Sequence, residues 1–266
     1  MTGVAQSVSF DRAADFYDET RADPPDVAAK LTDALLRELA AFEADRLLEV
    51  GVGTGRIARP LLERGVRVTG VDIAPRMMAK LREQLAPQHA RPDLLLADAT
   101  ALPFAPRTFR AVFVTHVLHL VSSYEAALDE VRRVVAPGGA FIHHHSRFPD
   151  EVWKPSMDKC HELMDAYGVE RRERPSEKEI RAKLRALRGS VRRVEYAEFE
   201  WRLTPSYWVE CARNRVDSWS WQVPDEVYPP LFADYERWMH EHYGDMERER
   251  PQRVQHALEV WTFDGG

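Results

Sequence analysis

Short apolar runs alternate with segments of helical spacing through the first 150 residues. Five runs have the length and composition of buried strands, at 47–50, 67–71, 94–97, 110–115 and 140–145. Between them apolar residues recur every three or four positions, as at Ile57, Leu61 and Leu62, which is typical of helices with one buried face. The alternation predicts an α/β fold built on an open sheet.

Glycine occupies every second position directly after the first run. Glu49 lies in the run itself, and Gly51, Gly53 and Gly55 follow before the helical spacing resumes. Such a stretch allows a sharp backbone turn and leaves no Cβ between the backbone and a ligand. The helix that follows directs unsatisfied N–H groups at the same place. The pattern therefore predicts the first strand, turn and helix of a nucleotide-binding domain.

Acidic residues follow the next two strands as well. Asp72 ends the second strand about 20 residues after the glycine turn, a spacing that suits an acid reaching a ribose diol. Asp98 ends the third. Three successive strands thus bring Glu49, Asp72 and Asp98 to one edge of the sheet. A dinucleotide-binding fold does not require acidic residues at the ends of its first and third strands.

Four motifs in this order resemble those of the class I S-adenosylmethionine-dependent methyltransferases. They are Glu49-x-Gly51-x-Gly53-x-Gly55, Val71-Asp72-Ile73, Ala97-Asp98-Ala99-Thr100-x-Leu102-Pro103-Phe104 and Ala136-Pro137-Gly138-Gly139. The resemblance extends over roughly residues 10 to 148, and within the family it is similar to the small-molecule, quinone-biosynthesis subgroup. It implies a Rossmann-like, mostly parallel sheet of seven strands with an antiparallel edge strand.

The resemblance also implies roles for individual residues. Glu49 and the glycines Gly51, Gly53 and Gly55 would hold the methionine part of S-adenosylmethionine, and Asp72 the ribose hydroxyls. Ile73 would pack on the adenine, and Asp98 would accept from its amino group with Ala99 close by. Two further cofactor candidates are Met77, for which plain core packing is the simpler explanation, and Thr115 at the end of the fourth strand.

The front segment, 10–21, carries a pair with the spacing of a family motif that closes over the cofactor. Tyr17 would lie near the sulfonium, where an aromatic ring attracts positive charge. Arg21 would pair with the methionine carboxylate. The alternative is a solvated N-terminal helix with one packed aromatic face.

Histidines gather after the fourth and fifth strands. His116 follows the fourth strand at the ligand edge and is the best single candidate for a catalytic or acceptor-facing group. The run 143–145 ends the fifth strand, where alternation puts His143 and His145 on one face and His144 on the other. His116, His143 and His145 could in principle form a metal site, but the sequence lacks a Cys or acidic pattern of metal spacing, and no metal is predicted.

The composition changes after residue 149. All seven tryptophans lie beyond it, at Trp153, Trp201, Trp208, Trp219, Trp221, Trp238 and Trp261. Helices are expected near 151–167, 176–188, 205–216 and 225–243, with strands at 191–201 and 254–263. We therefore predict a cofactor-binding core over 1–149 and a helical cap over 150–266, inserted around the last two sheet strands. The tryptophans fit either an apolar acceptor pocket or the cap's own core.

Bulk properties narrow the function further. A net charge of −6 argues against general duplex binding. The two cysteines, Cys160 and Cys211, have no paired or metal-like spacing, there is no signal-peptide pattern, and no apolar run is long enough to span a bilayer. A cytoplasmic protein is expected. The local excess of Arg and Lys over 171–193 is most simply a solvated face, with an anionic substrate, RNA or a membrane surface as alternatives.

The sequence as a whole predicts an S-adenosylmethionine-dependent methyltransferase acting on a small, partly apolar acceptor, with S-adenosylhomocysteine as product. Transfer from a sulfonium is an in-line displacement that needs alignment and exclusion of water, and a base only for protic acceptors. Alternatives are an RNA or tRNA methyltransferase and a non-catalytic cofactor-binding protein. A nicotinamide oxidoreductase fits poorly, because Arg56 interrupts its glycine pattern. The acceptor, the methylated atom and the oligomeric state stay open.

Overall fold

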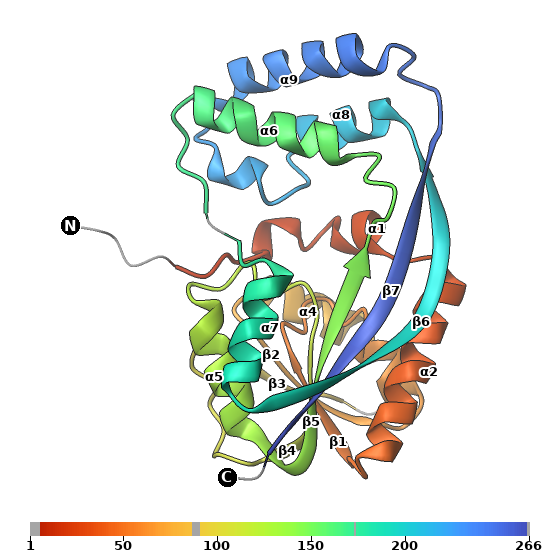
Figure 1. Cartoon of the computed structure of the whole chain (residues 1–266), viewed down its shortest axis with the longest axis vertical. Helices are drawn as coiled ribbons and strands as arrows, with labels where there is room; N and C mark the ends of the chain where they lie inside the picture. Colours follow the sequence, from red (N-terminus) through yellow and green to blue (C-terminus); the bar gives the residue numbers. More distant parts are fainter. Residues whose placement is uncertain (1–5, 87–90, 173, 265–266) are drawn as a thin grey trace, which may run out of the picture. The chain divides into compact units, whose positions relative to one another are not determined.

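The chain folds into two compact units whose segments interleave along the sequence. The computed structural model describes residues 6–86, 91–172 and 174–264. Unit one comprises Met1–His145, Arg174–Ala197 and His256–Gly266, and unit two comprises Ser146–Glu173 and Glu198–Gln255. The division differs from the predicted single boundary after residue 149, because the chain returns to unit one between the two segments of unit two (Figure 1).

A seven-stranded sheet forms the centre of unit one. In spatial order its strands are β3 (Asp93–Leu96), β2 (Arg67–Asp72), β1 (Arg46–Val50), β4 (Phe109–Val114), β5 (Val135–Arg147), β7 (Arg250–Phe263) and β6 (Gly189–Leu203). The pairs from β3 to β5 are parallel, and Figure 1 shows β7 running opposite to β5. The predicted mostly parallel α/β sheet is confirmed, with β7 and β6 at one end of it.

The central strands are apolar because helices cover both faces of a parallel sheet. Leu47 and Leu48 of β1 point to opposite faces and belong to two different core clusters. Both side chains are fully buried. Glu49 is the exception in this strand, a carboxylate buried among apolar neighbours, and it lies at the end where the glycine turn begins.

The helices of unit one begin in different ways, some at a side-chain cap and some at a proline. They are η1 (Asp11–Ala13), α1 (Tyr17–Arg21), α2 (Pro25–Ala41), α3 (Ala58–Glu63), α4 (Pro75–Gln84), α5 (Tyr124–Val134) and α7 (Glu177–Ala186). The Ser123 hydroxyl accepts from the Ala126 N–H to cap α5, and Ser176 and Glu179 form a capping box on α7. Helix α7 therefore belongs to unit one, although it was predicted within the cap.

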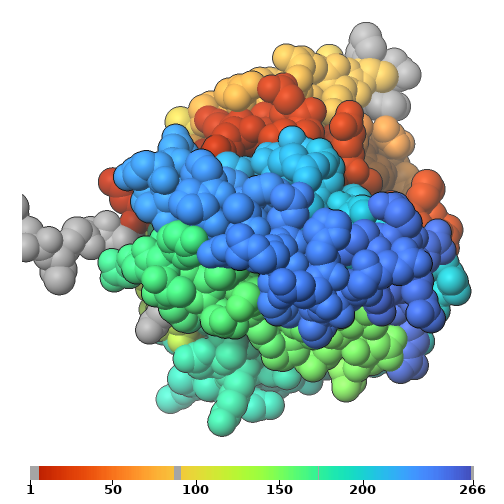
Figure 2. Space-filling model, turned by 90° about the horizontal axis from the view of Figure 1, so that it is seen from above, coloured from red at the N-terminus to blue at the C-terminus, as the bar shows by residue number. Residues whose placement is uncertain are grey.

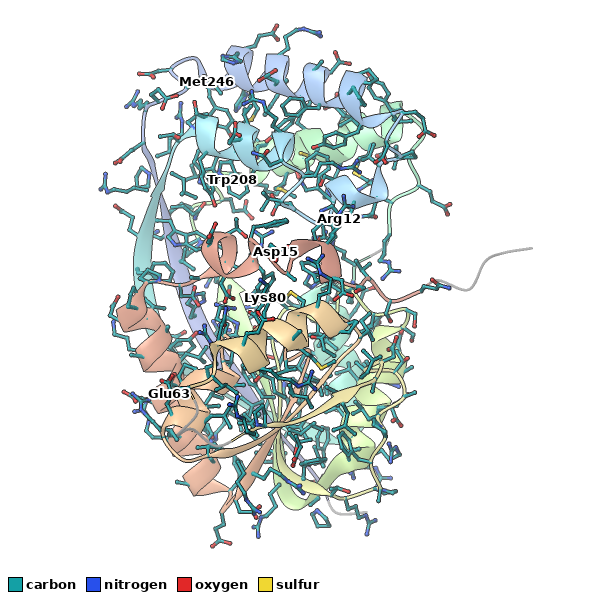
Figure 3. The ribbon with its side chains drawn as sticks, turned by 180° about the vertical axis from the view of Figure 1, so that it is seen from behind. Arg12, Asp15, Glu63, Lys80, Trp208 and Met246 are labelled. Atoms are coloured by element: carbon teal, nitrogen blue, oxygen red, sulfur yellow. The ribbon has the colours of Figure 1, made fainter. Side chains whose placement is uncertain are left out.

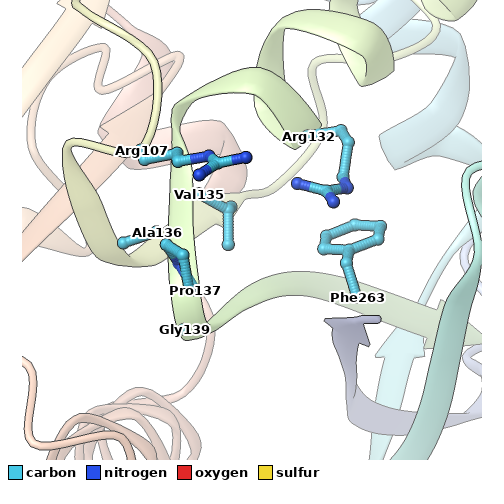
Figure 4. Close-up of a pocket in the computed structure, with 7 residues that line it drawn as sticks. All are labelled: Arg107, Arg132, Val135, Ala136, Pro137, Gly139 and Phe263. Atoms are coloured by element: carbon cyan, nitrogen blue, oxygen red, sulfur yellow. The ribbon is translucent and has the colours of Figure 1, made fainter. Parts of the chain in front are cut away.

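The fifth strand begins earlier than predicted. The Pro137-Gly138-Gly139 segment was expected to be a turn before a strand at 140–145, but β5 already begins at Val135. The register against β4 shifts between Phe109 and Ala111, which absorbs the irregular segment as a bulge. Gly139 is required there, since a Cβ would lie 2.7 Å from the Arg110 carbonyl oxygen. A pocket beside this bulge is lined by Arg107, Arg132, Val135, Ala136, Pro137, Gly139 and Phe263 (Figure 4).

Unit two is a helical unit with its own aromatic core. Its helices are α6 (Lys154–Ala166), α8 (Pro205–Arg213), η2 (Ser220–Gln222) and α9 (Tyr228–Tyr243). Trp153 and Trp219 are buried in this core, and Trp208 and Trp238 pack against it. Figure 2 shows the outer surface of α9 in blue and α6 in green. Trp261 instead lies in β7, fully buried in the core of unit one.

None of the helices in the described ranges is both long enough and apolar enough to cross a membrane.

Candidate functional site

The glycine turn after β1 is held by the carboxylate at the end of β2. All three glycines have positive φ angles, 81° at Gly51, 53° at Gly53 and 76° at Gly55, a region that disfavours other residues. Asp72 Oδ2 accepts from the Gly53 N–H at 2.8 Å and Oδ1 from the Ala74 N–H at 2.9 Å. Burial raises the pKa of Asp72, and these hydrogen bonds offset only part of the rise. Each carboxylate oxygen keeps a lone pair for a ligand hydroxyl.

Glu49, at the same edge of the sheet, has a buried carboxylate oxygen without a hydrogen-bond partner. Its side chain is 1% exposed, and the oxygen without a partner among the described residues is Oε2. Burial raises its pKa to about 8; the nearby Asp72 charge adds to the rise and Arg56 opposes it. A buried, unpaired carboxylate is costly unless a positive or donor group joins it. The arrangement is suited to a ligand that brings such a group.

The third carboxylate, Asp98, is organised by the loop that follows β3. Its Oδ1 accepts from both the backbone N–H and the hydroxyl of Thr100 at 2.8 Å. Burial raises the pKa of Asp98, but hydrogen bonds from Ser7 and Thr100 outweigh it and lower the pKa overall. Ala99 is buried in the core, while Ile73 is half-buried after β2. Because β1, β2 and β3 are neighbours, the three acids lie at or just after the carboxyl ends of adjacent strands.

The front segment packs against α4 and the glycine turn. Tyr17 meets the ring of Phe10 edge-on at 6.0 Å, and both pack on buried Met77. The Met77 methyl group would lie 3.3 Å from a Cβ at Gly53. Burial raises the pKa of Tyr17. Arg21 Nη1 donates to the Thr20 carbonyl at 3.4 Å.

Two side-chain contacts hold this segment against the rest of unit one. The Thr54 hydroxyl donates to Asp18 Oδ1 at 2.5 Å. On the outer side, Lys80 Nζ lies 3.0 Å from Asp15 Oδ1, and Figure 3 shows the two side chains near each other. The N-terminal segment is therefore packed on the glycine turn and α4, and its role in cofactor binding stays a prediction beside the alternative of a solvated helix.

His116 occupies an unusual backbone position directly after β4. Its φ is 54°, a left-handed conformation that a non-glycine residue holds at a cost and that often marks a functional site. The residue as a whole is exposed, while desolvation of its imidazole by the surrounding protein, with the charges of Arg56 and His119, lowers its pKa to about 3. At neutral pH this imidazole is uncharged and a weak base.

His116 lies beside His144 and not beside the other two histidines of β5. The His116 and His144 rings are 5.6 Å apart and edge-on, while His145 Nδ1 lies 3.0 Å from Glu177 Oε1 of α7. The metal set weighed from the sequence therefore does not assemble around His116. Across the described residues no group of three or more His, Cys, Asp or Glu side chains could hold a metal ion.

Four polar side chains that sequence reasoning missed lie next to these histidines. Arg56 Nη1 donates to Asp23 Oδ2 at 2.8 Å, and His256 Nε2 lies 3.3 Å from Asp23 Oδ1. Tyr196 OH lies 2.9 Å from His144 Nε2. Asp23 precedes α2, Arg56 follows the glycine turn, and the other two come from β6 and β7. No local motif marks any of them, because only the sheet order brings them together.

The methyltransferase domain model matches residues 48–143 of this chain. Malonyl-[acyl-carrier protein] O-methyltransferase of Halorhodospira halophila is 37% identical over 149 residues, covering 53% of this chain and 50% of that protein. Demethylmenaquinone methyltransferase of Thermus thermophilus is 40% identical over 99 residues, covering 36% of this chain and 45% of that protein. The chain thus spans about half the length of the curated relatives it matches.

Solved structures share the fold over nearly the whole chain. The YcgJ protein of Bacillus subtilis superposes with a TM-score of 0.57 at 16% identity, covering 88% of this chain and 99% of that one. The [4+2]-cyclase SpnF superposes with a TM-score of 0.57 at 18% identity, covering 98% and 99%. At such identities the likeness concerns the fold alone. The residues that match the methyltransferase domain model, 48–143, include the glycine turn and the parallel strands β2, β3 and β4.

Proposed function

We propose that the protein is an S-adenosylmethionine-dependent methyltransferase that acts on a small, partly apolar acceptor. The observation that carries the proposal is the unpartnered buried Oε2 of Glu49 beside a glycine turn that Asp72 holds in place. S-adenosylmethionine brings both an ammonium group and a ribose diol, which are the complements of these two carboxylates.

The remaining candidates fit the rest of that ligand. Asp98 offers an acceptor for the adenine amino group, and half-buried Ile73 offers an apolar surface for the ring. Tyr17, on the inner side of the front segment, offers an aromatic face to a sulfonium, and Arg21 a partner for a carboxylate. When bound, S-adenosylmethionine supplies an activated methyl group, so the protein need only align the acceptor and exclude water.

The acceptor class is inferred from the relatives and from His116. The relatives are named for methylation of a malonyl group and of demethylmenaquinone, which supports an organic acyl or quinone-like acceptor, and the first of the two names supports oxygen as the methylated atom. His116 contributes a neutral imidazole at the ligand edge, because its pKa is lowered to about 3. We assign it to hydrogen bonding with the acceptor, since so weak a base is poorly matched to proton removal at neutral pH.

The basic segment 171–193 has less charge available to RNA than its sequence indicates, because several of its cations pair with acids of the same unit. In unit two, Arg171 pairs with Asp165. In unit one, Arg181 pairs with buried Glu259, Lys183 with Asp129 and Arg192 with Glu38. A surface that binds phosphates needs cations available to them, so the observations favour a small-molecule acceptor.

Titration calorimetry with S-adenosylmethionine, S-adenosylhomocysteine and NAD tests the proposal. We expect binding of the first two and little of NAD. Preference for NAD would contradict the proposal. A methyl-transfer assay with a labelled methyl group against phenols, quinols and carboxylic acids then distinguishes an enzyme from a non-catalytic binding protein, because the latter would bind the cofactor and transfer nothing.

A further inference from the structure

The pocket beside the β5 bulge lies at the edge of the sheet opposite to the candidate cofactor residues. Two of its lining residues are Arg107 and Arg132, and we call it the arginine pocket (Figure 4). Val135, which also lines it, begins β5 and pairs with Phe109 at the start of β4. His116 follows the other end of β4, a strand of six residues that spans roughly 17 Å. The arginine pocket is therefore separate from the proposed cofactor site.

Two guanidinium groups from different segments of unit one approach the same space. Arg107 belongs to the turn before β4, where its φ is 60° and its N–H donates to the Arg133 carbonyl at 2.8 Å. Arg132 belongs to the last turn of α5. Figure 4 shows the two guanidinium groups extending toward each other. Among the seven described residues that line the pocket none is acidic, so it concentrates positive charge in a chain whose net charge is −6.

Arg132 and Arg133 are neighbours in α5 but have different partners. Arg133 Nε donates to Glu130 Oε1 at 2.6 Å, and its Nη2 donates to Oε2 of the same carboxylate at 2.7 Å. The Arg132 guanidinium instead lies 5.0 Å from the centre of the Phe263 ring, and its Nη2 donates to the Asp264 carbonyl at 3.3 Å. Across the described residues no carboxylate pairs with Arg132, and these two contacts leave several of its five N–H donors for a ligand.

The end of α5 explains how the protein holds two like charges together without a ligand. The helix ends at Val134, and the C-terminal end of a helix carries a partial negative charge of about half an elementary unit. This charge stabilises nearby cations, but it cannot balance two full positive charges. An anion that enters the arginine pocket would therefore gain favourable electrostatic energy.

The size and geometry of the pocket select the kind of anion. The pocket has a volume of about 270 Å³, counted with the open space at its mouth, which is below the roughly 300–1,000 Å³ of sites that enclose a whole drug-sized ligand. A planar carboxylate matches one guanidinium fork, whereas a tetrahedral phosphate presents oxygens in several directions and can meet two forks. Val135 and Pro137 add an apolar wall beside the two cations.

We propose that the arginine pocket is a second ligand site, which binds the phosphate group of inorganic phosphate or of a small phosphate monoester between Arg107 and Arg132. The inference goes beyond the proposed methyl transfer and does not rest on it, because the pocket lies at the opposite edge of the sheet. The two ligands share one chemistry, and the experiments below distinguish them.

The first experiment locates the site by NMR on protein labelled with ¹⁵N-glycine. Inorganic phosphate, added at constant ionic strength, should shift the signals of Gly138 and Gly139 until they saturate. The signals of Gly51, Gly53 and Gly55 in the glycine turn should stay in place. The proposal would be overturned if phosphate shifted only the signals of the turn, or if sodium chloride at the same ionic strength gave the same saturable shifts.

Three variants test the two arginines. Arg107→Gln and Arg132→Gln should each weaken phosphate binding by about 10-fold or more, because each removes charge-assisted hydrogen bonds. Arg110→Gln is the matched control, since Arg110 lies exposed on β4, pairs with Glu43 at 3.5 Å and does not line the pocket. It should keep the native affinity. Native affinity in both pocket variants, or an equal loss in the control, would overturn the proposal.

Unchanged signals of the turn glycines in the same spectra show that each variant is folded. Should one pocket variant fail to fold, the other variant and the titration of the native protein still decide.

The last experiment identifies the source of the phosphate group. Inorganic phosphate, phenyl phosphate and benzoate are titrated into the native protein in turn. A lower Kd for phenyl phosphate than for inorganic phosphate would support the proposal with an ester as ligand, and the reverse order would support it with the free anion. Benzoate should bind at least about 10-fold more weakly than either, because it cannot meet both forks. Binding of benzoate as tight as that of the phosphates would overturn the proposal.

Discussion

Two groups of histidines lie on opposite faces of β5 and have different partners. On one face His144 contacts Thr115, Tyr196 and His256 at the ligand edge. On the other face, His145 contacts Glu177 of α7. The charges of Glu259 and Arg181 act on the pKa of His143 on that face. Successive residues of one strand thus serve two regions, since strand side chains alternate between faces.

Burial alone does not distinguish the two faces. It lowers the pKa of His143 to about 4 and also lowers the pKa of His144 and of His145. What differs is the surrounding network. On the α7 face the carboxylates belong to ion pairs that hold a helix on the sheet, whereas on the ligand face a single carboxylate, Asp23, joins Arg56 to His256. The comparison teaches that partners, and not burial, assign a role to a buried histidine.

Removing Arg181 should give the largest effect and should act on stability. Arg181 Nε donates to Glu259 Oε1 at 2.8 Å, and Glu259 is 4% exposed. Arg181→Met leaves this carboxylate buried without its partner, which we expect to cost about 3 kcal/mol of the free energy of unfolding. Urea unfolding followed by circular dichroism measures it.

The control for Arg181 is Arg64→Met. Arg64 pairs with Asp33 on the exposed surface of unit one at 3.1 Å, where a salt bridge contributes about 1 kcal/mol or less. If both variants lost the same free energy of unfolding, the buried pair of Arg181 and Glu259 would not differ in stability from the exposed pair of Arg64 and Asp33. S-adenosylmethionine binding should survive in both.

Removing the Asp72 carboxylate should weaken cofactor binding at the ligand edge of the sheet. Asp72→Ala deletes the acceptors of the Gly53 and Ala74 N–H groups and the proposed ribose partner. We expect cofactor binding to weaken by about 2 kcal/mol, or roughly 30-fold, as measured by calorimetry. Asp33→Asn, an exposed acid on α2, is the matched control. Native affinity in Asp72→Ala would exclude Asp72 from the site.

At neutral pH the smallest effect should come from His143 on the α7 face, because its titration changes stability only in acid. The pKa of His143 falls from 6.5 to about 4 on folding, so between these values the unfolded chain binds a proton that the folded chain does not. Stability is therefore full above pH 6.5 and decreases as the pH falls toward 4. His143→Gln should reduce that slope by up to about 1.4 kcal/mol per pH unit. An unchanged slope would show that His143 is not the titrating group.

Much of the fold could be predicted from the sequence because its signals are local. The buried strands, the glycine turn and the acids at strand ends are short patterns, and the structure confirms the sheet they imply. Gly51 illustrates why: its φ of 81° is a requirement that one residue type satisfies, so the requirement is visible in the sequence itself.

The contact between Asp23 and His256 could not be predicted because the two residues are far apart in sequence. Asp23 and His256 meet only because β7, the last strand, lies next to β5. The early start of β5 was missed for a related reason, since the bulge at Gly139 depends on the register against β4. Both features follow from pairing between strands, which single-sequence patterns do not contain.

The order of the strands also has a consequence for biosynthesis. β6 is made well before β7, yet in the sheet β7 is the neighbour that joins β6 to β5. As the chain leaves the ribosome, the backbone of β6 stays unpaired on the side of β7 until β7 has emerged. The sheet of unit one is therefore completed only with β7, and a nascent chain that stalls before this strand would present an open sheet edge, which is prone to aggregate.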